Sequence, residues 1–185
     1  MNQDSINQIE NYIAICKKLS DCRFIKETKN IKFSLNYKDG YAKLTIGDFD
    51  EDLLRSCLID FRKLYLVKEK TNFLRICNLI NKLSKDKEVI NNVDKCRERY
   101  KYLLENSTIG FTINEDVQKP KKIIDDWLHG SYFHEDEDKK SVIDNLHMGS
   151  PIHKTIFLTA VVDLIHISIL LSNNAILLLE KRVVS

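Results

Sequence analysis

An apolar stretch at residues 155–172 (TIFLTAVVDLIHISILLS) limits what this chain can fold into more than any other feature. Eighteen mostly apolar residues approach the length that a helix needs to cross a bilayer. Asp163 and His166 lie at the centre of the stretch, however, and an ionisable pair at mid-span is costly in lipid. The sequence therefore favours a long helix, roughly residues 152–181, buried in a soluble core or in a dimer interface.

The rest of the chain also has the composition and periodicity of a helical protein. Only two prolines and five glycines occur among 185 residues, so residues that break helices are scarce. Apolar residues return every three or four positions in several further segments, which predicts helices there. These segments are residues 4–22, 50–65, 71–84, 86–106, 115–128 with an interruption near Pro120, and a shorter one at 139–147.

One region near the N-terminus has a different period. Ile31, Phe33, Leu35 and Tyr37 alternate with polar residues, and a second alternating run covers residues 41–46. Lys38-Asp39-Gly40 between the two runs is typical of a tight turn. The pattern predicts a small β-hairpin, and residues 107–113 give a weaker indication of a short extended segment.

No repeat or flexible linker separates these pieces, so the sequence predicts a single domain over residues 1–185. Within it, residues 1–49 would form a helix plus the hairpin, and residues 50–185 a helical bundle. The predicted fold class is mostly α, in an α+β arrangement with the hairpin laid against the bundle. We expect the long apolar helix to be enclosed by the helices that contain Leu53 and Phe73, or by a second copy of the chain.

Charge and cysteine content narrow the class of protein. The 29 basic and 27 acidic side chains are interleaved and leave a net charge of +2, which gives no support for a nucleic-acid partner. The first residues lack the basic start and apolar run of a signal peptide. Five cysteines without a CxxC pair are typical of reduced thiols in a cytoplasmic protein. The Asn, Lys and Ile bias suggests an AT-rich bacterial or phage source.

The segment at residues 125–140 (DDWLHGSYFHEDEDKK) gathers histidines and carboxylates as no other part of the chain does. A divalent metal needs three or four such ligands, and the sequence offers His129, His134, Asp136 and Asp138. The spacing matches no familiar metal motif. The alternative interpretation is a helix end that runs into a solvated acidic turn, anchored to the bundle by three aromatic side chains, Trp127, Tyr132 and Phe133.

A polar stripe interrupts the apolar helix. Thr159, Asp163, His166 and Asn173 follow one another at separations of four, three and seven, so they share a helix face. Asp163 could orient His166 as a base, as in nucleophilic triads, but no nucleophile motif accompanies the pair. The alternative is a buried, hydrogen-bonded layer that sets the register of a helix interface.

Three arginines form the last candidate set. Arg55 and Arg62 are seven residues apart on one predicted helix face, and Arg75 comes from the next helix. Clustered guanidinium groups suit a phosphate, a carboxylate or a nucleic-acid backbone. Salt bridges to nearby acids are the simpler explanation.

The sequence lacks glycine-rich phosphate loops and the common catalytic signatures. We therefore expect a soluble, cytoplasmic, non-catalytic interaction or regulatory module that forms a homodimer through its apolar helix. One alternative is a metal-dependent hydrolase or nuclease that uses the His129 and His134 cluster. The other is an anion or nucleic-acid binder that uses Arg55, Arg62 and Arg75.

Overall fold

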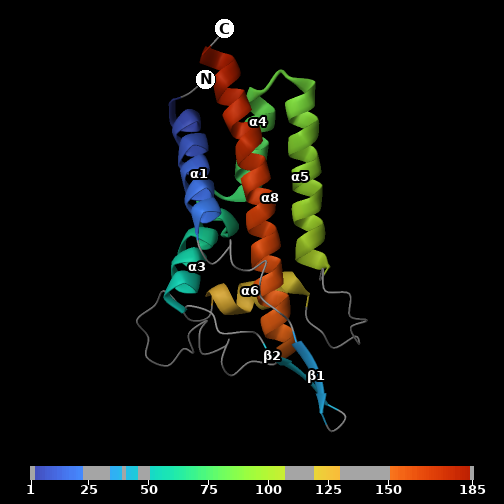
Figure 1. The fold of residues 1–185 in the computed structure, drawn as a ribbon. Coiled ribbons are helices and arrows are strands. Elements are labelled where there is room, and N and C mark those ends of the chain that lie inside the picture. Colours follow the sequence, from blue (N-terminus) through green and yellow to red (C-terminus); the bar gives the residue numbers. More distant parts are fainter. Residues whose placement is uncertain are drawn as a thin grey trace.

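The part of the protein that the structure describes consists mainly of helices (Figure 1). A computed structural model describes residues 3–22, 34–38, 41–45, 51–106, 119–129 and 151–183. Six helices occur in these ranges: α1 (Gln3–Asp21), α3 (Glu51–Tyr65), α4 (Phe73–Leu83), α5 (Lys87–Glu105), α6 (Pro120–His129) and α8 (Pro151–Val183). Two strands, β1 (Ser34–Lys38) and β2 (Tyr41–Thr45), pair antiparallel with Tyr37 opposite Ala42.

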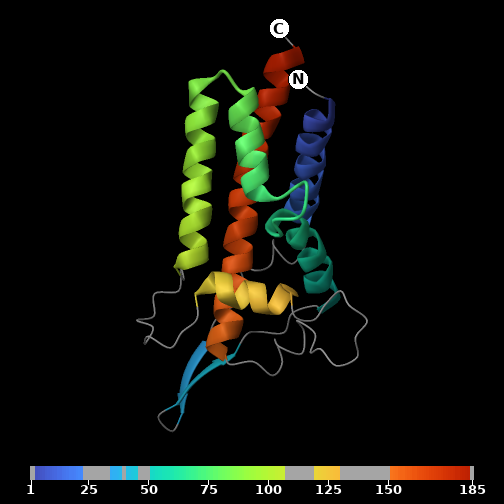
Figure 2. The same ribbon diagram turned by 180° about the vertical axis from the view of Figure 1, so that it is seen from behind.

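Helix α8 runs through the middle of the bundle and contacts every other described helix. In Figure 1, α1 and α5 lie on either side of it and α4 lies behind. Seen from behind, α6 runs across the lower part of α8, below α4 (Figure 2). The start of α1 and the end of α8 lie at the same end of the bundle. The strand pair lies at the other end, beside the first turns of α8.

The ends of the helices follow local sequence rules. Asn72 caps α4, because its side-chain oxygen accepts hydrogen bonds from the backbone N–H groups of Leu74 and Arg75. Asp86 caps α5 in the same way, at 2.8 Å from the Glu88 nitrogen. Pro120 is the first residue of α6, where a missing N–H costs nothing. The expected interruption near this proline is therefore the start of a helix.

Aromatic contacts join the helices within one core. Phe73 of α4 stacks on Tyr100 of α5 with ring centroids 4.0 Å apart. Trp127 of α6 lies against Phe157 of α8 at 4.6 Å. All four rings are buried, and each aromatic pair adds about 0.5–1.5 kcal/mol beyond the burial of apolar area. These contacts fix α4 on α5 and α6 on α8.

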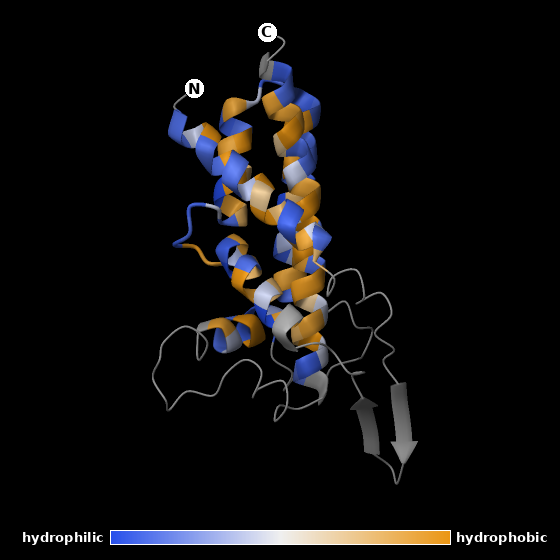
Figure 3. Cartoon of the chain, turned by 60° about the vertical axis from the view of Figure 1, so that its left-hand side comes forward, coloured by the Kyte–Doolittle hydropathy of each residue, from blue (hydrophilic) through white to orange (hydrophobic). Residues whose placement is uncertain are grey.

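The hydropathy of α8 fits its central position. Hydrophobic residues occur along most of its length (Figure 3). By length and composition alone, the segment His153–Lys181 would suffice to cross a membrane, and 61% of its most apolar window is buried inside the bundle. The helix therefore finds most of its apolar environment within the chain itself.

The α+β class predicted from the sequence is wrong, and the fold is a helical bundle. Among the residues whose burial the structure describes, which exclude both strands, every buried hydrophobic residue lies on a helix, apart from Leu66 just after α3. Two strands do not make a layer that covers a bundle, because an isolated pair is at best marginally stable. The apolar helix is instead enclosed by other helices. The turn residues Asp39 and Gly40 lie outside the described residues, as do the segments at 107–113 and 139–147.

The expected neighbours of the apolar helix also need correction. Helix α8 packs most extensively against α5 and α1, and only to a lesser extent against α4 and α3, the helices that contain Phe73 and Leu53. The α1 and α5 stripes also contribute to the core, with Ile9, Tyr12, Val93 and Tyr100 all buried.

Candidate functional site

The metal hypothesis falls mostly on residues that the structure does not describe. His134, Asp136 and Asp138 lie outside the described residues, and of His129 only the backbone is described, as the last residue of α6. Within the described ranges, no group of three potential metal ligands comes together. Metal binding by this cluster stays a prediction.

The aromatic residues of the same segment are partly accounted for. Trp127 is buried between α6 and Phe157 of α8, so it holds the short helix to the bundle as the alternative interpretation expected. Tyr132 and Phe133 lie outside the described residues. Trp127 is therefore a core residue and is not exposed to a partner.

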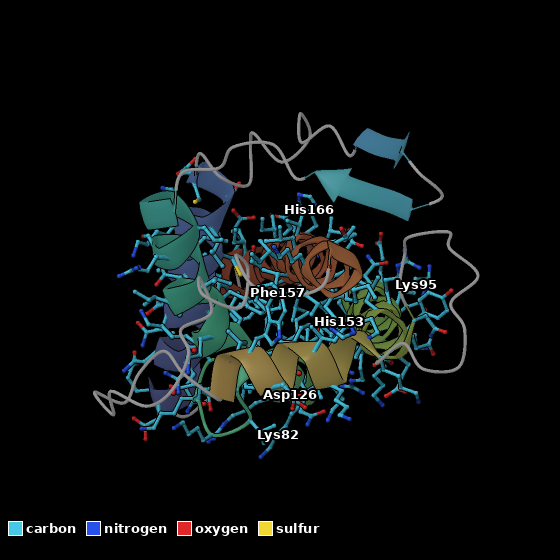
Figure 4. All side chains as sticks on the ribbon, turned by 90° about the horizontal axis from the view of Figure 1, so that it is seen from below. Lys82, Lys95, Asp126, His153, Phe157 and His166 are labelled. Atoms are coloured by element: carbon cyan, nitrogen blue, oxygen red, sulfur yellow. The ribbon has the colours of Figure 1, made fainter. Side chains whose placement is uncertain are left out.

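The four residues of the polar stripe on α8 are not buried together, contrary to expectation. Thr159, Asp163 and His166 are half-buried and Asn173 is exposed. Figure 4 shows His166 on the side of α8 opposite α6, whereas His153 lies toward α6. The stripe follows a helix face that emerges into solvent along its length. A catalytic role for Asp163 and His166 gains no support from this position.

The arginine set is distributed over the surface. Arg55 and Arg75 are exposed, and Arg62 is half-buried. The buried acid of α3, Asp60, is held by lysines: Nζ of Lys18 on α1 lies 2.6 Å and Nζ of Lys63 on α3 lies 2.9 Å from its carboxylate oxygens. Anion binding by the three arginines stays a prediction.

The second half of α8 exposes an apolar face. Leu170 is 51% exposed and Leu177 is 44% exposed. Asn173 lies between them, and the separations of three and four put all three residues on one side of the helix. Ile176, 36% exposed, lies at the edge of the same face. We call Leu170, Asn173, Ile176 and Leu177 the α8 face.

The opposite side of α8 is buried against α1 and is closed to solvent. The Tyr12 hydroxyl donates to the backbone oxygen of Ser168 at 3.0 Å, and the Cys16 thiol donates to the same oxygen at 3.4 Å. The Ser168 hydroxyl donates to the Leu164 carbonyl at 2.8 Å. Burial raises the pKa of Cys16 to about 12 and raises the pKa of Tyr12 well above its ordinary value. Both groups therefore stay protonated near neutral pH.

A cleft of about 380 Å³ opens where the α3–α4 connection meets α5 and α6. The Tyr65 hydroxyl donates to Asp125 Oδ1 at 2.7 Å, and Lys121 donates to Asp125 Oδ2 at 3.0 Å. Both carboxylate oxygens are thus engaged. The residues that line the cleft are Tyr65, Leu66, Val67, Lys68, Asn72, Leu74, Tyr100, Leu104, Lys121 and Asp125.

Both tyrosines of the cleft are neutral hydrogen-bond donors. Burial raises the pKa of Tyr65, and the hydrogen bond to Asp125 and the negative charge of that carboxylate raise it further. Burial raises the pKa of Tyr100 as well, with smaller contributions from Cys77 and Asp125. A deprotonated phenol is disfavoured at both positions, so neither tyrosine is suited to act as a base.

The sequence did not reveal the cleft, because its residues come from four separate segments. The only local signal was the pair Lys121 and Asp125, four apart on one helix, which is also the ordinary spacing of a surface ion pair. Tyr65 is 60 residues away from Asp125. No motif links the two.

The comparisons with known proteins did not assign the chain to a class, so the class of protein is described from the fold. Comparison of the chain with models of protein families, with curated proteins and with solved structures gave no match. The architecture defines the class as a helical bundle around one long apolar helix, with an exposed apolar face on that helix and a separate cleft.

Proposed function

We propose that the protein is a non-catalytic interaction module that works as a homodimer through the α8 face. The single observation that carries this proposal is the exposure of Leu170 and Leu177, 51% and 44%, on the helix that forms the centre of the bundle. Apolar side chains gathered on one face of a helix are typical of a protein contact surface. Their immediate neighbours Leu171 and Leu178 are buried, so the helix contributes to two interfaces at once.

The order of residues on the α8 face fits a second copy of the same chain. Leu170 and Leu177 lie at equal distances from the point between Asn173 and Asn174. A second α8 packed antiparallel about a two-fold axis at this point would place each Leu170 level with Leu177 of the second copy. The same axis would bring the asparagine amides of the two copies together. A self-complementary surface of this kind is what a two-fold interface requires.

The central amides would favour one alignment of the two helices over others. An asparagine within an apolar helix interface fixes register and orientation, at some cost in stability. Helix α8 is 33 residues long, about 50 Å at 1.5 Å per residue. An apolar helix of that length has many alternative alignments, and the asparagines select among them.

The localisation that goes with this proposal is the cytoplasm. All five cysteines are free thiols, four of them buried and Cys22 half-buried. Free thiols are typical of a reducing compartment. On this proposal the exposed part of α8 meets protein rather than lipid.

The first test is the oligomeric state of the full chain by sedimentation equilibrium from nanomolar to micromolar concentration. We expect a monomer–dimer equilibrium that Leu170→Asp and Leu177→Asp shift to monomer. Ile59→Asp is the matched control, since Ile59 is an exposed aliphatic residue (40%) on α3. A wild-type monomer throughout, or equal effects of the control and the α8 variants, would contradict the proposal.

A cross-linking experiment tests the antiparallel arrangement. With Cys22 changed to serine, we compare Asn173→Cys and Leu170→Cys under mild oxidation. Asn173 lies near the proposed axis, so two copies of Asn173→Cys should form a disulfide. Two copies of Leu170→Cys should not, because each would be level with Leu177. Equal cross-linking of the two variants would indicate a parallel pair. Binding of the chain to phosphatidylcholine vesicles that Leu177→Asp abolishes would favour a lipid surface instead.

A further inference from the structure

We propose that the cleft between the α3–α4 connection, α5 and α6 binds a small organic monoanion with an apolar body. Its volume of about 380 Å³ falls in the range of pockets that hold small molecules. The cleft and the α8 face have no residue in common, because no residue that lines the cleft comes from α8. The inference is therefore independent of the homodimer.

One wall of the cleft is a connection held in a fixed shape. The Leu66 nitrogen donates to the Arg62 carbonyl at 2.9 Å, and the Asn72 nitrogen donates to the Glu69 carbonyl at 3.1 Å. The Asn72 side chain donates to the Tyr65 carbonyl at 2.8 Å while it caps α4. A wall that is already ordered loses little conformational entropy when a ligand binds. The site is thus formed before the ligand arrives.

The charges of the cleft favour an anion. Asp125 is neutralised by Lys121 at 3.0 Å, and its other oxygen accepts from Tyr65. Lys68 is exposed and has no ion-pair partner within the described part of the chain. Among the lining residues this leaves one uncompensated positive charge, that of Lys68. A monoanion is the ligand charge that balances it.

Tyr100 supplies a second point of recognition. It lines the cleft, it is only 2% exposed, and its ring is fixed by stacking on Phe73. Its hydroxyl has no hydrogen-bond partner among the residues that the structure describes. Its oxygen is not one of the enclosed polar atoms that lack a partner, so it is open to the solvent of the cleft and can take a partner there. An acceptor oxygen of the ligand would provide it.

The remaining lining is aliphatic, which defines the body of the ligand. Leu66, Leu74 and Leu104 form the sides, and Val67 is 84% exposed at the rim. An aliphatic lining with few polar groups is the ordinary composition of a ligand pocket. The chemical class is an organic carboxylate with a short aliphatic or single aromatic body.

The test is an NMR titration of the ¹⁵N-labelled full chain with benzoate and with hexanoate. We expect saturable shifts of the amides at residues 66–72, 100–104 and 121–125. Benzamide keeps the shape without the charge, benzylamine reverses the charge, and inorganic phosphate has the charge without the apolar body. We expect each of these three to bind at least about threefold more weakly. Equal binding of benzamide or phosphate, or no shift of the cleft amides, would overturn the proposal.

Two variants separate the cleft from general surface binding. Lys68→Gln should weaken benzoate binding roughly threefold, because it removes the exposed charge. Tyr100→Phe should weaken it about threefold to tenfold, because it removes one hydrogen bond and leaves the aromatic stack. Lys82→Gln is the control, since Lys82 is exposed on α4 outside the cleft (Figure 4). Unchanged binding in both cleft variants, or an equal loss in the control, would contradict the assignment. Circular dichroism checks that each variant is folded.

Discussion

The two sides of α8 differ in what they contact. On its enclosed side, Leu164, Ser168 and Leu171 are buried, and the Tyr12 hydroxyl of α1 donates to the Ser168 carbonyl. Toward solvent, Leu170 and Leu177 are about half exposed. The side that carries buried polar groups with local partners belongs to the fold. The side that lacks cover is the one that we propose packs against a second chain.

The largest expected effect is a loss of stability at a buried leucine of α8, compared with its exposed neighbour. Leu171 is fully buried and Leu170 is 51% exposed. Leu171→Ala should lower the free energy of unfolding by about 2–5 kcal/mol, because it leaves a cavity. Leu170→Ala should change it by no more than about 0.5 kcal/mol in dilute, monomeric protein. Urea unfolding followed by circular dichroism measures both. Similar losses in the two variants would show that the two sides of α8 are equally enclosed.

The second largest expected effect is the loss of stability when the ion pair between α3 and α1 is removed. Asp60 of α3 has a side chain only 4% exposed and binds Lys18 of α1 at 2.6 Å. Asp60→Asn should cost about 1–3 kcal/mol, because hydrogen bonds to a charged group are lost. Urea unfolding at neutral pH gives the loss, and Glu105→Gln on α5, which pairs with Lys119 at the surface, is an exposed-pair control. A loss no larger than in the control would mean that Asp60 does not hold α1.

Asp60 should also make the bundle sensitive to acid. Burial opposes ionisation of this carboxyl, but the hydrogen bonds from Lys18 and Lys63 outweigh it and lower its pKa. A lowered folded-state pKa gives stability that is fully present above the unfolded value of about 3.9 and is lost as the pH falls through the folded value. The drop in unfolding free energy between pH 5 and pH 2 should be smaller in Asp60→Asn. An identical drop would contradict this assignment.

A smaller effect should follow from the polar contact within the buried side. Tyr12→Phe removes the hydroxyl that donates to Ser168 at 3.0 Å and keeps the ring. The loss should be about 0.5–1.5 kcal/mol, the net value of one neutral hydrogen bond. Tyr102→Phe is a control, since Tyr102 is 52% exposed. Equal stabilities of both variants and the wild type, by thermal unfolding, would assign this contact no role.

The last prediction concerns the rate of a chemical reaction at a thiol and not the stability of the fold. Cys16 is buried in the α1–α8 contact, and burial raises its pKa to about 12. Its thiol should react with iodoacetamide at pH 8 only when α1 moves away from α8, far more slowly than the half-buried Cys22. Peptide mapping by mass spectrometry measures both rates. Leu171→Ala should speed the reaction of Cys16 and leave that of Cys22 unchanged.

Helix positions were predictable from the sequence because their signals are local. Three residues mark helix starts in the structure, and each comes directly before a run of apolar residues at helical spacing: Asn72, Asp86 and Pro120. Helix partners were not predictable. Helices α1, α3, α4 and α5 each have an apolar stripe, and a stripe does not specify its partner, so the sequence could not show that α1 and α5 pack most extensively on α8. The pairing rests on contacts such as Tyr12 to Ser168, 156 residues apart.

The sites were harder to predict than the helices, for a related reason. The polar stripe of Asp163 and His166 was visible in the sequence, but its exposure depended on which helices cover α8. The cleft depends on Tyr65 and Tyr100 meeting Asp125, and each tyrosine alone is an ordinary core residue. Only the assembled bundle distinguishes a tyrosine of the closed core from one that lines a cleft.

Because α8 follows every other described helix in the sequence and contacts all of them, the bundle must be completed late during synthesis. On the ribosome, α1, α3, α4 and α5 can pack on one another, as α4 does on α5, but the parts of their apolar stripes that contact α8 stay uncovered until α8 leaves the exit tunnel. Contacts of such long sequence separation slow folding and leave nascent chains prone to aggregation. The helix that organises the finished protein is thus also the one that its nascent chain lacks for longest, and chaperone demand should be concentrated in that interval.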